Sequence, residues 1–342
     1  MQRRREFLAG VTAAALTATA GCTTVGETES RTTRLNLAYD AAPPHFQAVV
    51  MQQREQLASI PARVEANEAS CKSIVQLLVS GKADLGMIGM IPALVAIDSD
   101  ESMQAITASS KDAFVVMATE TVADRYDERG GAAIAAFAEE SGRPFELGTY
   151  PKGSVSDITA RYWIQETDGI TAEDVDLVHL GGPNAAQQAL LADEVDGALI
   201  PEPTPTVIEA SDAPYRRIDW VGEFLPGEPA GVTVVREEFA RDHPDVVEAF
   251  VEEHVAATEF IHGNAGRAAE YMTSAYGGES ALDEQIARKA IERPATEYVS
   301  DPRAVVDGTA VLARYAGQLG KTDTVIDTDR IFETRYYDRV VD

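Results

Sequence analysis

The sequence predicts an α/β protein of two lobes, each a mostly parallel β-sheet flanked by helices, with a helical region at the C-terminal end. Short apolar runs alternate with helical stretches from Leu35 onward, and this alternation is typical of parallel sheets with helices on both faces. The alternation starts again after Gly130-Gly131, which indicates a second lobe. Beyond Glu237 the pattern is helical.

The first series begins with a short apolar strand and a loop that carries an aromatic residue and two prolines. Predicted strands cover residues 35–38, 62–66, 85–88, 104–109 and 113–118, and predicted helices cover residues 46–57 and 70–80. A further helix begins near Pro92, because a proline suits the first helical turn, where its missing N–H is not needed. A polar turn at residues 110–112 separates the last two strands.

The second series has predicted helices at residues 132–140, 154–167 and 185–192, and predicted strands at residues 145–148, 175–179 and 197–200. One more strand, at residues 232–235, precedes the helical tail, in which Pro244 opens a helix and Gly263 ends it. Ligands of open α/β sheets bind beyond the carboxyl ends of the strands. The loops from strand to helix are therefore where a binding site is expected.

The N-terminal leader indicates export. Arg4-Arg5-Glu6-Phe7-Leu8 is typical of a twin-arginine signal, and the apolar run at residues 9–20 is too short to span a bilayer. Small residues then precede Cys22, which is typical of a lipoprotein cleavage site. We expect residues 1–21 to be a signal peptide for the Tat pathway, Cys22 to carry a lipid, and residues 22–33 to be a flexible tether. The alternative is a basic terminus with an accidental cysteine.

Composition narrows the class of partner. The chain has 29 Lys and Arg against 56 Asp and Glu, a net charge of −27. Residues 1–21 hold three arginines and one glutamate, so the remainder carries 26 minus 55, or −29. This excess argues against nucleic-acid binding, and scattered acidic residues are typical of salt-adapted, halophilic proteins. Apart from Cys22 the chain has only Cys71, which excludes a disulfide framework and a paired-cysteine metal site.

The most specific segment is Tyr150-Pro151-Lys152-Gly153-Ser154-Val155-Ser156-Asp157, which follows a strand and opens a helix. Ser154 can cap that helix, with Asp157 three residues later completing a capping box. Gly153 allows a ligand close to the backbone, and N–H groups at a helix N-terminus attract anions. Gly153, Ser154 and Val155 are therefore candidate ligand-binding residues. The alternative is a well-capped helix without a ligand.

The neighbouring motifs resemble those of the substrate-binding proteins of ABC importers in the nitrate, sulfonate and taurine class, which also covers thiamine-pyrimidine binders. The resemblance covers residues 34–262 and depends on the order and spacing of the motifs at residues 77–86, 153–154, 162–163, 175–178, 181–182, 188–190, 195–198, 202–203, 239–240 and 243–247. It implies a type II periplasmic-binding-protein fold, with lobe 1 at residues 34–117 and 227–342, lobe 2 at residues 118–226, and crossings near Ala118 and residues 224–227.

The function that the resemblance implies is an extracytoplasmic solute-binding lipoprotein on the outer face of the cytoplasmic membrane. It would deliver a small anion or sulfonate-like solute, such as nitrate, a sulfonate or taurine, to an ABC importer by lobe closure. The partners implied are the permease and ATPase subunits of that importer and the membrane through Cys22. A monomer is expected, with no cofactor, no metal and no nucleic acid.

The remaining candidate ligand-binding residues lie in loops that follow strands or open helices. They are Tyr39, His45 and Phe46 in the first loop, Ser70 and Cys71 at the second helix, Met90 at the third, Ser109 at a strand end, Asn184, and Glu202 between two prolines. Each has a structural alternative: a buried thiol for Cys71, a core side chain for Met90, a helix cap for Asn184 and a structural acid for Glu202.

Other functions remain open at this point. A ligand sensor without a permease fits the same features, and so does an enzyme on the same fold. We expect no catalytic residues, because the histidines (His45, His179, His243, His254 and His262) are dispersed and no nucleophile-elbow motif is present. Helix N-termini favour a small anion or sulfonate, whereas Glu202 and the aromatic loop favour a zwitterion or a heterocycle.

Overall fold

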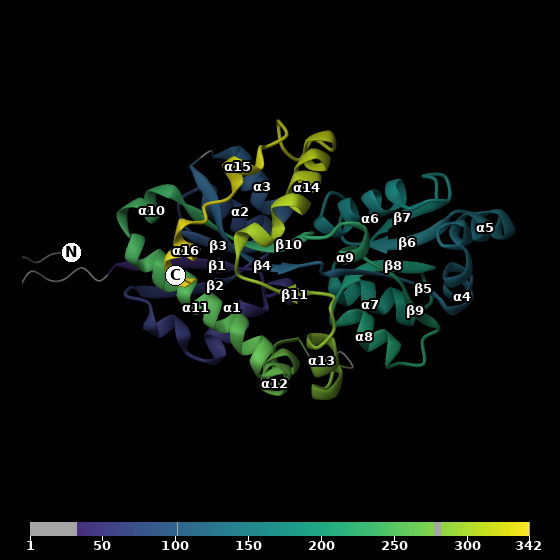
Figure 1. Ribbon diagram of the computed structural model, residues 1–342, viewed down its shortest axis with the longest axis horizontal. Coiled ribbons are helices and arrows are strands. Elements are labelled where there is room, and N and C mark those ends of the chain that lie inside the picture. The colour runs from purple at the N-terminus through teal and green to yellow at the C-terminus, as the bar shows by residue number, and fades with distance from the viewer. Residues whose placement is uncertain (1–32, 101, 277–281, 342) are drawn as a thin grey trace, which may run out of the picture. The chain divides into compact units, whose positions relative to one another are not determined.

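Two β-sheets organise the part of the chain that the structure describes, which is residues 33–100, 102–276 and 282–341 of this computed structural model (Figure 1). The predicted signal peptide, Cys22 and nearly all of the predicted tether lie outside these described residues. No helix within the described ranges has the length and apolar character needed to cross a membrane.

The first sheet contains six strands in the order β11-β4-β10-β3-β1-β2. Their bounds are β1 Arg34–Tyr39, β2 Arg63–Glu68, β3 Leu85–Gly89, β4 Met103–Lys111, β10 Pro229–Arg236 and β11 Glu297–Tyr298. β1 pairs in parallel with β2 and β3, whereas β10 lies antiparallel between β3 and β4. β10 is central because its Val-rich run is buried on both faces and Thr107 donates to Thr233 across the ladder at 2.8 Å.

The second sheet contains five strands in the order β7-β6-β8-β5-β9. Their bounds are β5 Phe114–Thr119, β6 Phe145–Thr149, β7 Val175–His179, β8 Gly197–Pro201 and β9 Tyr215–Trp220. β6 pairs in parallel with β7 and β8, and β5 runs antiparallel to β8 and β9. Both sheets are therefore mixed.

Helices connect most of the strands in chain order, and the last helices follow β11 (Figure 1). The α-helices are α1 Phe46–Gln53, α2 Cys71–Val79, α3 Met90–Ser99, α4 Glu120–Arg129, α5 Ala132–Ser141, α6 Val155–Glu166, α7 Pro183–Leu191, α8 Thr204–Glu209, α9 Val221–Phe224, α10 Glu237–Asp242, α11 Pro244–Gly263, α12 Ala265–Tyr276, α13 Glu284–Ile291, α14 Val306–Gln318, α15 Thr328–Ile331 and α16 Arg335–Val341. The 3-10 helices are η1 Pro43–His45, η2 Gln56–Ser59 and η3 Pro302–Val305.

Buried aliphatic side chains fill the space between each sheet and its helices. One cluster runs from α3 of the first sheet to α6 of the second and includes Leu94, Ile158 and Leu312. α14 packs against both α3 and α6, so the C-terminal region contacts elements of both sheets. α3 and α6 directly follow the loops after β3 and β6, so this packing lies beside the carboxyl ends of those two strands.

The fold class and the alternating order of elements are confirmed. Some details of the prediction were wrong. The sheets are mixed rather than mostly parallel, because β10 and β5 run against their neighbours. The strand expected at residues 113–118 pairs within the second sheet, so the chain passes from the first sheet to the second before Phe114. The expected boundary between lobe 1 and lobe 2, at residues 117/118, therefore falls inside β5. The helix expected at residues 46–57 ends at Gln53, where Glu55 takes a left-handed φ of 57°.

Candidate functional site

The loops at the carboxyl ends of β1, β3 and β6 meet around Asp40. Asp40 directly follows β1, and its Oδ2 accepts a hydrogen bond from the Cys71 thiol at 2.9 Å. Cys71 is the first residue of α2, and the Gly89 N–H at the end of β3 points at its sulfur. Tyr150 directly follows β6, and Asp40 acts electrostatically on it. The edges of the two sheets therefore contribute to one cluster.

Two buried polar atoms in this cluster have no hydrogen-bond partner among the described residues: His45 Nδ1 and the Tyr150 hydroxyl oxygen. His45 is 2 % exposed, and its ring lies so close to Gly231 that a methyl group there would overlap it. The Tyr150 ring packs edge-on against Phe114, with centroids 6.5 Å apart. Because buried polar groups in folded proteins are nearly always paired, these two atoms call for a partner, which an ordered water or a ligand can supply.

Burial sets the protonation of the cluster. It lowers the pKa of His45 to about 4, against a smaller opposing effect of Asp40, so the imidazole is neutral at neutral pH. Burial, together with Asp40, raises the pKa of the Cys71 thiol to about 12 and raises the pKa of Tyr150. Cys71 and Tyr150 thus keep their protons, and the cluster offers hydrogen bonds from neutral groups beside one carboxylate.

The N-termini of three helices point toward this cluster. α2 begins at Cys71 and is capped by Ser70, whose hydroxyl accepts from the Ser73 N–H at 3.4 Å. α3 begins after Gly89 without a side-chain cap. α6 begins at Val155, whose Cγ2 would lie 3.7 Å from a Cβ placed on Gly89, so α3 and α6 start side by side. Their combined dipoles favour negative charge in the space between them.

The partial positive charge at the N-terminus of α6 is partly neutralised by a carboxylate of the protein itself, that of Asp157. Ser154 caps the helix as predicted and accepts from the Asp157 N–H at 3.3 Å, while Asp157 accepts from the Gly153 N–H at 2.8 Å. Asp157 also bonds Arg161 and His179. Burial raises the pKa of Asp157, but the hydrogen bonds from these three donors outweigh it and hold that pKa below its ordinary value.

The structure brings part of the predicted site together and leaves the rest elsewhere. His45, Cys71 and Val155 lie in or beside the cluster, with Ser70, Gly153 and Ser154 adjacent to them in the chain. Phe46 and Met90 are fully buried core side chains, and Tyr39 donates to Gln52 at 3.3 Å. Ser109 is buried too, with its carbonyl bonded to Gln47 at 2.6 Å, and Asn184 is exposed at the start of α7.

Glu202 has its bonding capacity filled by its own surroundings. The side chain is 2 % exposed, and Oε1 accepts from Arg217 at 2.5 Å and from the Thr206 hydroxyl at 3.0 Å. Oε2 accepts from the Thr206 N–H at 3.2 Å. This arrangement supports the structural alternative for Glu202, because a carboxylate with these partners has little capacity left for a ligand.

Sequence reasoning missed Asp40 and Tyr150 as candidate site residues. Both directly follow a strand, at the positions where ligands of α/β sheets bind. That position was the available signal. It was not sufficient, because the two residues are far apart in the chain and only the packing of the sheets brings Tyr150 within the electrostatic influence of Asp40. Within the described residues, no group of three or more His, Cys, Asp or Glu side chains has the geometry for a metal ion.

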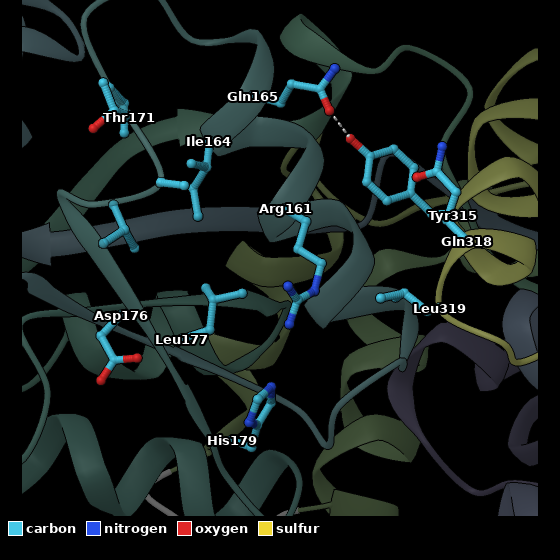
Figure 2. Close-up of a pocket in the computed structure, with 13 residues that line it drawn as sticks. Arg161, Ile164, Gln165, Thr171, Asp176, Leu177, His179, Tyr315, Gln318 and Leu319 are labelled. Atoms are coloured by element: carbon cyan, nitrogen blue, oxygen red, sulfur yellow. Dashed lines mark hydrogen bonds between the residues drawn. The ribbon is translucent and has the colours of Figure 1, made fainter.

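A cavity of about 710 Å³ lies elsewhere, between α6, β7 and α14 (Figure 2). Tyr315 bonds Gln165 at 2.5 Å at one end of it, and Asp176 lies at the other. Arg161 and His179 also line it, but Asp157 already partners both. Its described polar groups are thus mostly satisfied, and none of the predicted site residues lines it, so the Asp40 cluster is the better candidate site.

Comparison with known proteins identifies the family of the chain. The NMT1-like family matches residues 28–275. The taurine-binding periplasmic protein of Escherichia coli strain K12 is 29 % identical over 193 residues, which are 55 % of this chain and 53 % of that protein, so the match spans about half the length of this relative.

Solved structures share the fold at low identity. The periplasmic aliphatic sulphonate binding protein of Escherichia coli has a TM-score of 0.70 at 14 % identity, over 88 % of this chain and 92 % of that chain. The periplasmic nitrate-binding protein of Synechocystis PCC 6803 has a TM-score of 0.68 at 14 % identity, over 91 % of this chain and 88 % of that chain. The predicted fold and class resemblance are confirmed and, since the family match covers well over half of the chain, the protein belongs to the NMT1-like family.

Proposed function

We propose that this protein is an extracytoplasmic solute-binding protein that captures a small sulfonate-like solute and delivers it to an ABC importer. The observation that carries the proposal is the meeting of three helix N-termini around two unpartnered buried atoms, His45 Nδ1 and the Tyr150 hydroxyl. Small-molecule sites are concave and have a few convergent polar groups of this kind. The family and the shared fold support the same function.

The chemistry of the cluster favours a zwitterion over a simple anion. Helix N-termini stabilise a negative group, but the Asp40 carboxylate, which already accepts from Cys71, attracts a positive or N–H-bearing group. An aminosulfonate such as taurine meets both requirements, whereas nitrate meets only the first. The taurine-binding relative supports this choice.

Binding rather than catalysis is favoured by the state of the only thiol in the cluster. The thiolate is the nucleophilic form of cysteine, and the pKa of Cys71 is raised to about 12. His45 is buried and neutral, so it is not poised to exchange protons near pH 7.

We propose that the lobes follow the two sheets and that closure between them encloses the solute and is what the importer recognises. Asp40 follows a strand of the first sheet and Tyr150 follows a strand of the second, so closure brings the loops that carry them toward each other. Loss of solute uptake in a deletion strain supports delivery to an importer. Unchanged uptake favours the alternative of a sensor without a permease.

Thermal unfolding of the purified protein in molar KCl tests the ligand class. The solutes are taurine, ethanesulfonate, nitrate, bicarbonate and a pyrimidine, and a ligand at one hundred times its dissociation constant adds about 2.7 kcal/mol to the free energy of unfolding. We expect a shift with taurine that Asp40→Asn removes, and no change in that shift with Asp176→Asn, a matched control in the other cavity. No shift with any solute, after unfolding and refolding to remove carried-over ligand, overturns the proposal.

We also propose export through the Tat pathway, a lipid on Cys22, anchoring to the outer face of the cytoplasmic membrane, a monomeric state and adaptation to high salt. The leader residues and the net charge of −27 support these proposals. Cys22→Ser is expected to move the protein from the membrane fraction to the soluble fraction. Retention of this variant in the membrane fraction overturns the lipid anchor.

A further inference from the structure

Two carboxyl groups join the segments that cross between the sheets. Asp112 lies between β4 and β5, and Glu228 lies directly before β10. Asp112 Oδ1 accepts from the N–H groups of Gly227 at 2.7 Å and Glu228 at 3.2 Å, and the Asp112 N–H donates to the Glu228 carbonyl at 2.9 Å. In return Glu228 Oε2 accepts from the Ala113 N–H at 3.3 Å. Each crossing segment therefore holds the other.

The Glu228 side chain is fully buried, and its Oε1 has no hydrogen-bond partner among the described residues. α14 closes over it, because a methyl group on Gly308 would overlap the Gly227 carbonyl and lie 2.8 Å from the Glu228 Cα. A charge on this carboxyl is costly, since burial of an ion without a partner is strongly unfavourable.

The surrounding charged groups do not compensate Glu228. Lys111, on the opposite crossing segment, lies 3.8 Å from Asp112 and 3.2 Å from Glu297 of β11, so two other carboxylates share it. The charged groups on the other elements packed nearby are exposed or paired elsewhere: Glu223 of α9, Asp307 of α14, Arg303 of η3 with its partners Asp301 and Asp338, and Asp219 of β9, which accepts from Tyr126 and Trp163.

We propose that this carboxyl pair makes the joint between the two sheets sensitive to pH: the crossing segments hold while Glu228 keeps its proton, and they loosen when the proton is released to solvent. Burial raises the pKa of Glu228 to about 8, partly opposed by the Ala113 N–H and reinforced by Asp112, so the change falls in the mildly alkaline range. This pH sensitivity of the joint is a property beyond solute capture. Only the further step, that a loosened joint alters lobe closure, rests on the proposed function.

The sign follows from proton linkage. Glu228 titrates at 4.5 when unperturbed and at about 8 in the folded protein. Between these values the folded protein holds a proton that the unfolded chain has released, so this group lowers stability as pH rises. The unfolding equilibrium constant increases about tenfold per pH unit on its account and stops changing above the folded pKa.

Trp220 reports on this joint directly, because its indole N–H donates to the Asp112 carbonyl at 2.7 Å. The experiment records the tryptophan emission of the ligand-free protein from pH 6 to pH 9.5. Trp163→Phe leaves Trp220 as the only tryptophan. In that background we expect a transition with a midpoint near 8, none after Glu228→Gln, and an unaltered transition after Glu297→Gln, an exposed acid in the same cluster.

Absence of the transition, or its survival after Glu228→Gln, overturns the proposal. Asp112→Asn gives a second measurement if the glutamine variant does not fold. Removing the neighbouring carboxylate is expected to move the midpoint to lower pH, and an unmoved midpoint overturns the assignment to this pair. Because no solute is present, the outcome is independent of whether the ligand class is right.

Discussion

The ammonium group of Lys321 donates a hydrogen bond to the carbonyl oxygen of Lys152 at 2.9 Å, which joins the loop after α14 to the loop before α6. The Lys321 side chain lies directly against Gly153, at the position that a Cβ would occupy. Gly153 also has a φ of +77°, in the left-handed region. The left-handed conformation therefore favours glycine there, and a larger residue would also displace the exposed Lys321 side chain.

Gly153→Ala is expected to lower the free energy of unfolding by about 2–3 kcal/mol, because it adds left-handed strain and displaces Lys321 from its hydrogen bond to Lys152. Gly142→Ala is the matched control, since Gly142 has a φ of +69° and open space where a Cβ would lie. It should cost about 1–2 kcal/mol, from strain alone. Urea unfolding measures both. Equal losses in the two variants would contradict the role of the Lys321 contact.

Tyr150→Phe is expected to leave the free energy of unfolding within about 0.5 kcal/mol of the wild type, since its hydroxyl has no hydrogen-bond partner to lose within the described residues. The same change should weaken solute binding about tenfold, which calorimetric titration measures. Tyr215→Phe is the contrast, because the single proton of that hydroxyl is shared between the Val195 carbonyl at 2.6 Å and Asp193 Oδ1 at 2.7 Å. The Tyr215→Phe variant should lose about 1–2 kcal/mol of its free energy of unfolding, and its affinity for the solute should not change.

Glu202→Gln distinguishes a structural acid from a ligand-binding one. Removing the charge weakens the bonds to Arg217 and Thr206. We expect the free energy of unfolding, measured with urea, to fall by about 1–3 kcal/mol; the partial exposure of Arg217 keeps this loss small, because solvent screens the ion pair. Solute affinity should not change. Glu238→Gln, at an exposed pair with Arg236, should cost less than about 0.5 kcal/mol. A selective loss of affinity in Glu202→Gln would restore Glu202 to the binding site.

Acid should destabilise this protein through two buried histidines. Burial lowers the pKa of His45 to about 4 and of His254 to about 3, the latter with a smaller effect of His45. Between pH 6.5 and these values the unfolded chain binds protons that the folded protein does not. The free energy of unfolding should therefore fall with decreasing pH, by about 1.4 kcal/mol per unit for each histidine.

Urea unfolding at pH 7, 6, 5 and 4.5 measures this slope. His254→Gln is expected to remove about half of the histidine contribution, with some loss of stability at pH 7 from the bond between His254 and Ser300. The same slope in wild type and variant would show that His254 is not protected from protonation in the folded protein.

Much of the local structure was predictable. The strand at residues 175–179 and the cap at Ser154 match the structure, and Pro92 lies in the first turn of α3 as expected. These features depend on neighbours in the chain: apolar runs, a side chain that can reach its own helix, and a missing N–H. β9 was missed because Arg216, Arg217 and Asp219 interrupt its apolar pattern at a sheet edge, where polar residues remain partly exposed.

The sequence by itself determined many of the strands and helices, the likeness to a family and the loops in which a site would lie. Tertiary structure alone decided that β10 lies between β3 and β4, that Arg217 partners Glu202, and that the start of α6 lies beside the start of α3. Local structure follows from forces between residues near in sequence. Strand pairing and site assembly depend instead on contacts between residues far apart in the chain, which packing selects and periodicity does not encode.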